Sequence, residues 1–569
     1  MKKQLHSLSF LLLFLISSYP SLAQIGECVD IPKTRVMLVG DSWANFMWTY
    51  KSLTDALDQN GFADVKDNGN LTAIISMQAE TWDSDGWIDL LKARVKQMKD
   101  ADIFVIFIGG NDVIWKWRRD KPASILLPYA DEMLSHADDI IREILKIRPE
   151  AQFVIGSYDY PNFAETMEDV NNPYRDQWES FGYAPPSMLN DALIYFETYR
   201  EQYYKNQGNP QIHYINNIGV VQYYGGYPTP SLYEPYATFP PKSVPLPYGD
   251  KRYPSHPNYM GNYVGLVKDA FHLNGVGYRF IANNMIRNYI SGYLLKEFTP
   301  QYSQGDKDGW VSSLGQVSQG NGSRIGKVNA EDYAGIFTFN TKDLLKNIPI
   351  ENGALFLTKK SGVGELRNTN AAKDEIVVEM KVGHFGESDD IEAADFSDMA
   401  DFSSAGCVVG HAKINQDAKF RVDLSPDVLA AISQADQVQF RVKVNFAPNS
   451  GNLQFFDYYG GNEEDKYFAP TLELKYQGVK TAIKENNIKP LSLYPNPAID
   501  KLHIALPEEY RGVALQAYLT NMLGSVVKKW ALSGSDYQSL VDIEGLPAGV
   551  YNLNLTDGKS VRNGRVVIQ

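Results

Sequence analysis

The sequence is poor in cysteine, with only Cys28 and Cys407 in 569 residues. This leaves no cysteine-based metal site, and we expect neither a metal nor another cofactor. An oxidising compartment would permit one bridge between the two cysteines. Because they stand far apart in the chain, such a bridge would join two domains, but the spacing leaves open whether it forms.

An excess of positive charge is also lacking. Lys and Arg number 54 against 68 Asp and Glu, which gives a formal net charge of −14. General nucleic-acid binders hold phosphates with clustered Lys and Arg side chains. The charge balance therefore argues against a nucleic-acid partner, and it leaves neutral substrates such as sugars and lipids open.

Long apolar runs are missing except at the N-terminus. Residues 1–23 open with Lys2 and Lys3, continue through LSFLLLFLISS and end in Ser-Leu-Ala. This order of basic, apolar and small residues is typical of a cleaved secretory signal peptide. As an uncleaved anchor, the run is short for a hydrocarbon layer of roughly 30 Å. We therefore expect an exported mature chain without a transmembrane segment.

A chain of 569 residues exceeds what one hydrophobic core organises, so several domains are expected. Residues 32–298 alternate strand-like and helix-like segments, which predicts a parallel sheet covered on both faces. Two short apolar runs, 35–39 and 102–108, indicate buried strands that end in glycine turns. Ligands bind beyond the carboxyl ends of such strands. Residues 40–42 (Gly-Asp-Ser) and 109–112 (Gly-Gly-Asn-Asp) both fall there.

A loop at residues 221–260 interrupts this pattern with nine prolines and eight tyrosines. A loop of this length inside a compact domain is usually functional or disordered. We expect an ordered wall facing the substrate, with Tyr223, Tyr224 and Trp43 as substrate-binding residues; a disordered linker is the alternative.

The rest of the chain is predicted to be β-rich. Residues 305–477 contain short alternating segments separated by polar turns, which indicates a β-sandwich. Residues 478–489 are polar and are predicted to be a linker. Residues 490–569 again contain short strands with Gly and Pro turns, and they are too few to form an enzyme by themselves.

Ser42 and His272 are the candidate catalytic pair. A serine hydroxyl becomes a good nucleophile only when a neighbouring base takes its proton. Ser42 follows a buried strand on a sharp turn, although Asp41-Ser42 could also simply cap the next helix. His272 has Asp269 three residues before it, close enough on a tight turn for a carboxylate to fix the tautomer of the imidazole.

Hydrolysis by such a pair also needs donors for the oxyanion of the tetrahedral intermediate. Asn111 offers a side-chain amide at the same edge of the sheet, and Ser42 offers its backbone N–H. A third donor is expected from residues 77–81. The alternative for Asn111-Asp112 is an ordinary turn pair after two glycines.

These motifs, in this order, resemble the block pattern of the SGNH/GDSL hydrolases, and His272–Tyr278 is similar to the final block of that family. The resemblance covers residues 32–298 and implies a flavodoxin-like three-layer α/β/α parallel sheet. It implies these roles: nucleophile Ser42, base His272, orienting acid Asp269 and oxyanion donors Ser42 and Asn111.

Two departures from the family pattern are visible. Trp43 follows the serine, where the family has an aliphatic residue. The second block of the family supplies a glycine amide to the oxyanion hole, and the best local match is Ala79, whose backbone amide can serve if its conformation does not require a positive φ.

The C-terminal block has a resemblance of its own. Residues 493–497 (LYPNP), 524–527 (GSVV) and 546–551 (LPAGVY) resemble the type IX secretion sorting domain. This implies export by the type IX machinery, with release or attachment at the cell surface. The alternative is a plain immunoglobulin-like module, and either way we expect a small immunoglobulin-like β-sandwich.

The middle block is similar to jelly-roll modules of the DNRLRE type at residues 308–310, 333–339 and 469–474. Some such modules bind polysaccharide, so a carbohydrate-binding role is one expectation and a spacer role the other.

The sequence as a whole therefore predicts a secreted or surface serine esterase that acts on carboxylic esters. The expected substrate is an acyl group, with acetyl favoured, carried by a polysaccharide. A lipase or polyester hydrolase is one alternative. A catalytically inactive surface protein for binding or adhesion is the alternative from another class.

Overall fold

The computed structural model describes residues 23–24, 32–163, 165, 172, 174–228, 238–263, 267–320, 322–346, 348–367, 374–403, 417–448, 451–477, 491, 493–494, 498–506, 510, 514–520, 526–533, 538–547, 549–556 and 561–568. The chain forms two compact units, Met1–Val479 and Lys480–Gln569. Cys28 and Cys407, the apolar run of the expected signal peptide and the expected linker lie outside the described residues.

The first part of the larger unit is built on a five-stranded sheet in the order β3-β2-β4-β5-β6, with every neighbouring pair parallel. Numbered along the chain, this is the 2-1-3-4-5 order of flavodoxin-like folds. The strands are β2 (Lys33–Gly40), β3 (Val65–Asn68), β4 (Ile103–Phe107), β5 (Gln152–Gly156) and β6 (Ile212–Ile215).

Alternate residues of the central strands enter two different cores, one on each face of the sheet. Val36 and Leu38 of β2 belong to one cluster, whereas Met37 and Val39 belong to the other. Side chains of a strand point alternately to opposite faces, so near-continuous apolar strands require helices on both sides. The expected three-layer α/β/α sheet is thereby confirmed.

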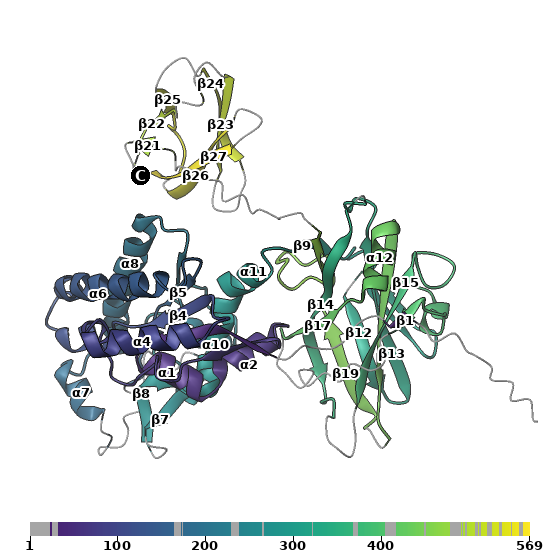
Figure 1. The fold of residues 1–569 in the computed structure, drawn as a ribbon, viewed down its shortest axis with the longest axis horizontal. Coiled ribbons are helices and arrows are strands. Elements are labelled where there is room, and N and C mark those ends of the chain that lie inside the picture. Colours follow the sequence, from purple (N-terminus) through teal and green to yellow (C-terminus); the bar gives the residue numbers. More distant parts are fainter. Residues whose placement is uncertain are drawn as a thin grey trace, which may run out of the picture. The chain divides into compact units, whose positions relative to one another are not determined.

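Helices α1, α2 and α10 pack on one face, and α4, α6 and α8 pack on the other, as Figure 1 shows. The helices of this part are α1 (Ser42–Thr49), α2 (Ser52–Gln59), α3 (Ala79–Trp82), α4 (Asp85–Gln97), α5 (Gly110–Val113), α6 (Leu127–Leu145), α7 (Arg175–Ser180), α8 (Pro186–Gln207), α9 (Val220–Gly225), α10 (Gly275–Met285) and α11 (Ser291–Leu294). Among the described helices, none combines the length and the apolar character needed to cross a membrane.

A small hairpin lies outside the main sheet and carries two of the predicted site residues. Strand β8 (Val267–Leu273) pairs antiparallel with β7 (Met260–Tyr263), but Asn262 faces Lys268 while Met260 faces Leu273. The residues between Lys268 and Leu273 therefore bulge out of the ladder. The bulge provides the tight local turn that the sequence predicts for Asp269 and His272.

The second part of the larger unit is the predicted β-sandwich, with a large apolar core between its strands and a smaller apolar cluster besides. A mostly antiparallel array runs in the order β1-β16-β15-β18-β13-β12-β19-β14-β20-β9. Its elements are β1 (Ala23–Gln24), β9 (Thr299–Tyr302), β10 (Gly309–Ser312), β11 (Val317–Gln319), β12 (Ser323–Val328), β13 (Glu331–Asn340), β14 (Ile350–Val363), β15 (Glu375–Val382), β16 (Phe402–Ser403), β17 (Lys419–Asp423), α12 (Pro426–Gln434), β18 (Gln437–Asn445), β19 (Leu453–Tyr458) and β20 (Thr471–Tyr476).

The smaller unit is also all β, with two sheets around a core of its own. One sheet has the order β21-β22-β25 and the other the order β24-β23-β26-β27. The strands are β21 (Leu493–Tyr494), β22 (Lys501–Ala505), β23 (Ala514–Thr520), β24 (Val526–Ser533), β25 (Gln538–Asp542), β26 (Gly549–Thr556) and β27 (Val561–Ile568). Two facing sheets fit the predicted small β-sandwich.

Candidate active site

Ser42 stands at the first turn beyond strand β2. Gly40 has φ +133°, and a Cβ there would lie 1.8 Å from the carbonyl oxygen of Phe107, so only glycine fits. Asp41 then caps helix α1, because its carboxylate accepts from the backbone N–H of Trp43 at 2.9 Å. The chain therefore passes from strand to helix within two residues, which holds Ser42 at the edge where ligands bind.

His272 joins Ser42 to Asp269. Its Nε2 lies 2.8 Å from the Ser42 Oγ, and its Nδ1 lies 2.7 Å from an oxygen of Asp269. The three residues that the sequence proposes as a triad are thus brought together across a separation of 230 positions. A base aligned on a serine and oriented by a carboxylate is the arrangement that activates a nucleophile.

Asp269 is buried but saturated with hydrogen-bond donors. It accepts from the Tyr174 hydroxyl at 2.9 Å and from the backbone N–H groups of Phe271 and His272 at 2.8 and 3.0 Å. Burial alone would raise the pKa of Asp269, but the hydrogen bonds and the His272 ring outweigh it and hold that pKa below its usual range. The carboxylate therefore stays ionised and fixes the tautomer of His272.

Two predicted oxyanion donors belong to residues that line the same cavity. The Ser42 N–H, in the first turn of α1, has no hydrogen-bond partner within the described part of the chain. Asn111 donates one amide hydrogen to the carbonyl of Met77 at 3.0 Å, which leaves its second hydrogen for a ligand. Both residues line one cavity with His272.

The third predicted donor, Ala79, is wrong. Its N–H points at the Asp112 carboxylate, with oxygens at 3.0 and 3.2 Å, and the residue is fully buried and does not line the cavity. The physical reason is that Ala79 is the first residue of helix α3. Its N–H has no partner within the helix, and the Asp112 carboxylate accepts from it instead.

Ser76 offers its backbone N–H to the cavity where Ala79 does not. It lines the cavity, and its N–H has no partner among the residues that the structure describes. Its φ of +63° is a conformation that glycine adopts easily and serine rarely. The sequence gives no direct signal for this residue beyond its place just before residues 77–81.

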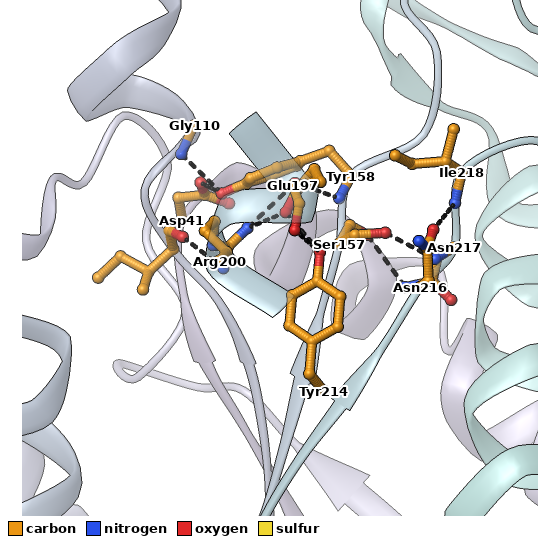
Figure 2. Close-up of polar contacts among 11 residues, drawn as sticks. Asp41, Gly110, Ser157, Tyr158, Glu197, Arg200, Tyr214, Asn216, Asn217 and Ile218 are labelled. Atoms are coloured by element: carbon orange, nitrogen blue, oxygen red, sulfur yellow. Dashed lines mark hydrogen bonds and ion pairs between the residues drawn. The ribbon is translucent and has the colours of Figure 1, made fainter. Parts of the chain in front are cut away.

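A buried network centred on Tyr158 includes Asp41 and Gly110, the residues that precede Ser42 and Asn111 in the chain (Figure 2). The Tyr158 hydroxyl donates to the Asp41 carboxylate at 2.5 Å and accepts from the Gly110 N–H at 2.9 Å. Burial raises the pKa of Asp41 to about 6 and that of Tyr158 well above its usual value, so the phenol remains a neutral donor. One hydroxyl therefore ties the neighbour of Ser42 to the neighbour of Asn111.

An ion pair anchors Tyr158 in turn. Its backbone N–H donates to Glu197 at 3.0 Å, and Arg200 binds the same carboxylate at 2.8 and 3.0 Å. Arg200 also donates to the carbonyl of Ile108 at 3.2 Å, at the end of strand β4. Glu197 and Arg200 are both completely buried. Removing either partner would leave an uncompensated charge in the interior, which strongly destabilises a fold. This network was not foreseen from the sequence.

Tyr158→Phe is expected to destabilise the α/β part without removing any atom of the Ser42–His272–Asp269 chain. It leaves the Asp41 carboxylate short of a donor and the Gly110 N–H without an acceptor, which costs about 1–3 kcal/mol. In a domain of this size that lowers the midpoint of thermal unfolding by about 3–10 °C. Tyr183→Phe, at a tyrosine that is 43% exposed, is the matched control, and equal midpoints for the two variants would contradict the assignment.

The site opens into a cavity of about 580 Å³. Trp43 is part of its lining, as predicted, and packs edge-on against Tyr158 at 5.3 Å and Tyr278 at 5.4 Å. Tyr223 and Tyr224 do not line it. They belong to helix α9, and the ring of Tyr224 stacks on Phe280 of α10, so their substrate-binding role finds no support in this cavity.

A family model matches the C-terminal part of the chain. Residues 492–569 match the family model described as a secretion system C-terminal sorting domain. The prediction of a sorting domain is thereby confirmed, and it supports secretion of the chain or its attachment at the cell surface. No curated protein matches the chain.

Solved structures to which the chain is similar share very little sequence with it. A carbohydrate esterase family 3 from Talaromyces cellulolyticus is 12% identical over 45% of this chain and 97% of that chain, with a TM-score of 0.23. An extracellular lipase from Streptomyces rimosus is 12% identical over 45% and 99%, with a TM-score of 0.25. A gut microbial diltiazem-metabolizing enzyme is 11% identical over 66% and 73%, with a TM-score of 0.29. Similarities this distant carry no argument about activity.

Proposed function

We propose that this chain is an exported serine esterase that hydrolyses carboxylic esters through Ser42, His272 and Asp269. The observation that carries the proposal is the unbroken chain of contacts from the Ser42 Oγ through both ring nitrogens of His272 to an ionised Asp269. The motif resemblance to the SGNH/GDSL hydrolases points to the same three residues. A cavity open to Ser42 supplies room for a substrate.

The first half of the reaction follows from this geometry. The Ser42 Oγ attacks the ester carbonyl carbon while His272 Nε2 takes the hydroxyl proton, and the carbonyl electron pair moves onto oxygen. The N–H groups of Ser42 and Ser76 and the side-chain amide of Asn111 stabilise that oxyanion. When the carbonyl re-forms, the bond to the alcohol oxygen breaks and His272 gives this oxygen the proton, which leaves an acyl group on Ser42.

The second half repeats these steps with water. His272 takes a proton from a water molecule while the water oxygen attacks the acyl carbon, and the same donors stabilise the oxyanion. The bond to the Ser42 Oγ then breaks, Oγ regains its proton from His272 and the carboxylic acid leaves. Asp269 stabilises the imidazolium in both halves without taking the proton itself.

Export completes the proposal. A signal peptide at residues 1–23 would direct the chain out of the cytoplasm, and the type IX machinery would recognise the sorting domain and release the enzyme or attach it to the surface. An acetylated polysaccharide is the substrate that the sequence favoured, with the β-sandwich as its binding module or as a spacer. The domain boundaries from the sequence, residues 32–298, 305–477 and 490–569, belong to the same proposal.

The direct test is turnover by the purified full-length chain. We expect hydrolysis of p-nitrophenyl butyrate above the buffer rate, and complete inhibition by a fluorophosphonate. A folded protein that hydrolyses none of a panel of p-nitrophenyl esters would contradict the proposal and favour a surface binding or adhesion protein.

Asn111→Ala tests the oxyanion assignment. Loss of one oxyanion donor typically lowers kcat by about 10²–10³-fold, because the donor acts mainly on the charge that develops in the transition state. We expect that loss with KM nearly unchanged, measured on p-nitrophenyl butyrate. Asn70→Ala is the control and should behave as wild type, because Asn70 is exposed and does not line the cavity. A kcat for Asn111→Ala within twofold of wild type would remove this residue from the role.

A further inference from the structure

The cavity beside Ser42 has two chemically different ends. The catalytic end carries the polar groups of Ser42, Asn111 and His272. The rest of the lining is mostly apolar, and its further polar members include Tyr158, Asp159, Tyr174, Gln177 and Asn262. The apolar lining residues are Val113, Ile114, Trp115, Trp117, Leu126, Phe163, Phe181, Leu189, Ala192, Leu193 and Phe196.

Helix α8 supplies one apolar wall. Leu189, Ala192, Leu193 and Phe196 are spaced three and four residues apart, so they share one face of the helix. All four line the cavity. Because they precede the buried Glu197–Arg200 pair on the same helix, this wall is fixed by the network that also positions Tyr158.

Aromatic rings from separate segments supply a second wall, called the aromatic wall below. Trp115 stacks on Phe181 with ring centroids 5.8 Å apart, and Phe163 meets Phe181 and Phe271 edge-on at 5.6 and 4.8 Å. Rings locked edge to face in this way form a stiff surface. Phe163 and Phe181 are each only 2% exposed, so packing fixes these two rings, whereas Trp115 is 47% exposed.

The alcohol part of the ester lies beside His272 and not between these two walls. His272 Nε2 must protonate the alcohol oxygen, so that oxygen lies beside His272, whose ring meets Phe46 at 4.9 Å. Phe271 and His272 both line the cavity, but the His272 ring contacts Phe46 and the Ser42 Oγ. The Phe271 ring packs instead against Phe163 at 4.8 Å and Tyr174 at 5.7 Å. The aromatic wall that includes Phe271 is therefore left to the other substituent of the carbonyl carbon, the acyl group.

An acetyl group leaves this space almost unused. Cavities of 300–1,000 Å³ enclose molecules of drug size, and about 580 Å³ falls well inside that range. Building on the esterase function proposed above, we infer that the enzyme takes esters of a medium-length apolar acyl group, about as long as octanoyl, which lies between helix α8 and the aromatic wall.

The test uses p-nitrophenyl esters that share one leaving group and differ only in the acyl chain, at concentrations below micelle formation. Each CH₂ that enters an apolar cavity adds about fourfold to kcat/KM. We expect butyrate to exceed acetate more than tenfold and octanoate to exceed butyrate. Acetate turned over as well as octanoate would overturn the inference and leave the esterase function standing. No turnover of any ester would overturn both.

A filled cavity should weaken this preference. Ala192→Leu adds bulk to the wall of α8, and we expect the octanoate-to-acetate ratio of kcat/KM to fall at least tenfold. Met188→Leu is the matched control on the same helix, at a side chain that is 39% exposed, and it should keep the wild-type ratio. An unchanged ratio in folded Ala192→Leu would contradict the placement of the acyl group, and if this variant does not fold, the wild-type chain-length profile decides alone.

Discussion

Ser42→Ala is expected to lower kcat for ester hydrolysis by about 10⁶-fold, the loss seen when a serine hydrolase is deprived of its nucleophile. The residue left behind can neither attack the carbonyl nor carry the acyl group. A small rate above the buffer reaction should remain, because the oxyanion donors and the cavity are still in place. The measurement is a steady-state assay on p-nitrophenyl butyrate.

The same substitution should hardly change stability. Among the described residues, the Ser42 hydroxyl makes one side-chain hydrogen bond, to the His272 ring, which also lines the cavity. Ser84→Ala is the control for the substitution itself, because Ser84 is an exposed serine at the N-cap of α4 that makes no side-chain capping bond. Turnover by Ser42→Ala near the wild-type rate, or a large drop in its unfolding midpoint, would contradict the role assigned to Ser42.

Asp269→Asn is expected to lower kcat by about 10⁴-fold, less than Ser42→Ala. The side-chain carbonyl of asparagine can still accept from the two backbone N–H groups that bind the Asp269 carboxylate. Its NH₂ group would then face His272 Nδ1, which must accept instead of donate. The ring proton would move to Nε2, and His272 could no longer take the proton of Ser42.

The pH dependence of stability gives a second readout for Asp269. Its pKa is lower in the folded chain than its ordinary value, so the carboxylate stabilises the fold above the unfolded pKa, and this contribution is lost as the pH falls through the folded pKa. The difference in unfolding midpoint between wild type and Asp269→Asn should therefore shrink towards acid pH. Asp176→Asn, at an exposed position of α7, is the control. A kcat for Asp269→Asn within tenfold of wild type would contradict the orienting role.

Much of the site could be predicted from short sequence motifs. Gly40-Asp41-Ser42 predicted a strand-to-helix turn because glycine is required where the backbone meets Phe107 and aspartate caps the helix. Asp269 and His272 are three residues apart, so a single bulge in β8 is enough to bring them together. The alternation of strand-like and helix-like segments likewise predicted the three-layer sheet, because strands that are buried on both faces are recognisable as near-continuous apolar runs.

Features that depend on distant partners could not be predicted in this way. The Ala79 amide is taken by Asp112, which stands 33 residues later, and the bond from Tyr158 to Asp41 spans 117 residues. Tyr223 and Tyr224 were assigned to a substrate wall by composition, but composition does not say which surface a ring meets. The apolar part of the cavity is assembled from separate stretches of chain, and no periodicity within one of them reveals it.

The covalent role of Ser42 is the centre of this account, and mapping a fluorophosphonate adduct tests it most directly. The purified full-length enzyme is inhibited with the reagent, digested and analysed by peptide mass spectrometry. The account predicts one stoichiometric adduct on Ser42, formed at a rate that matches the loss of esterase activity. An adduct on another serine, or full inhibition without an adduct on Ser42, would contradict it.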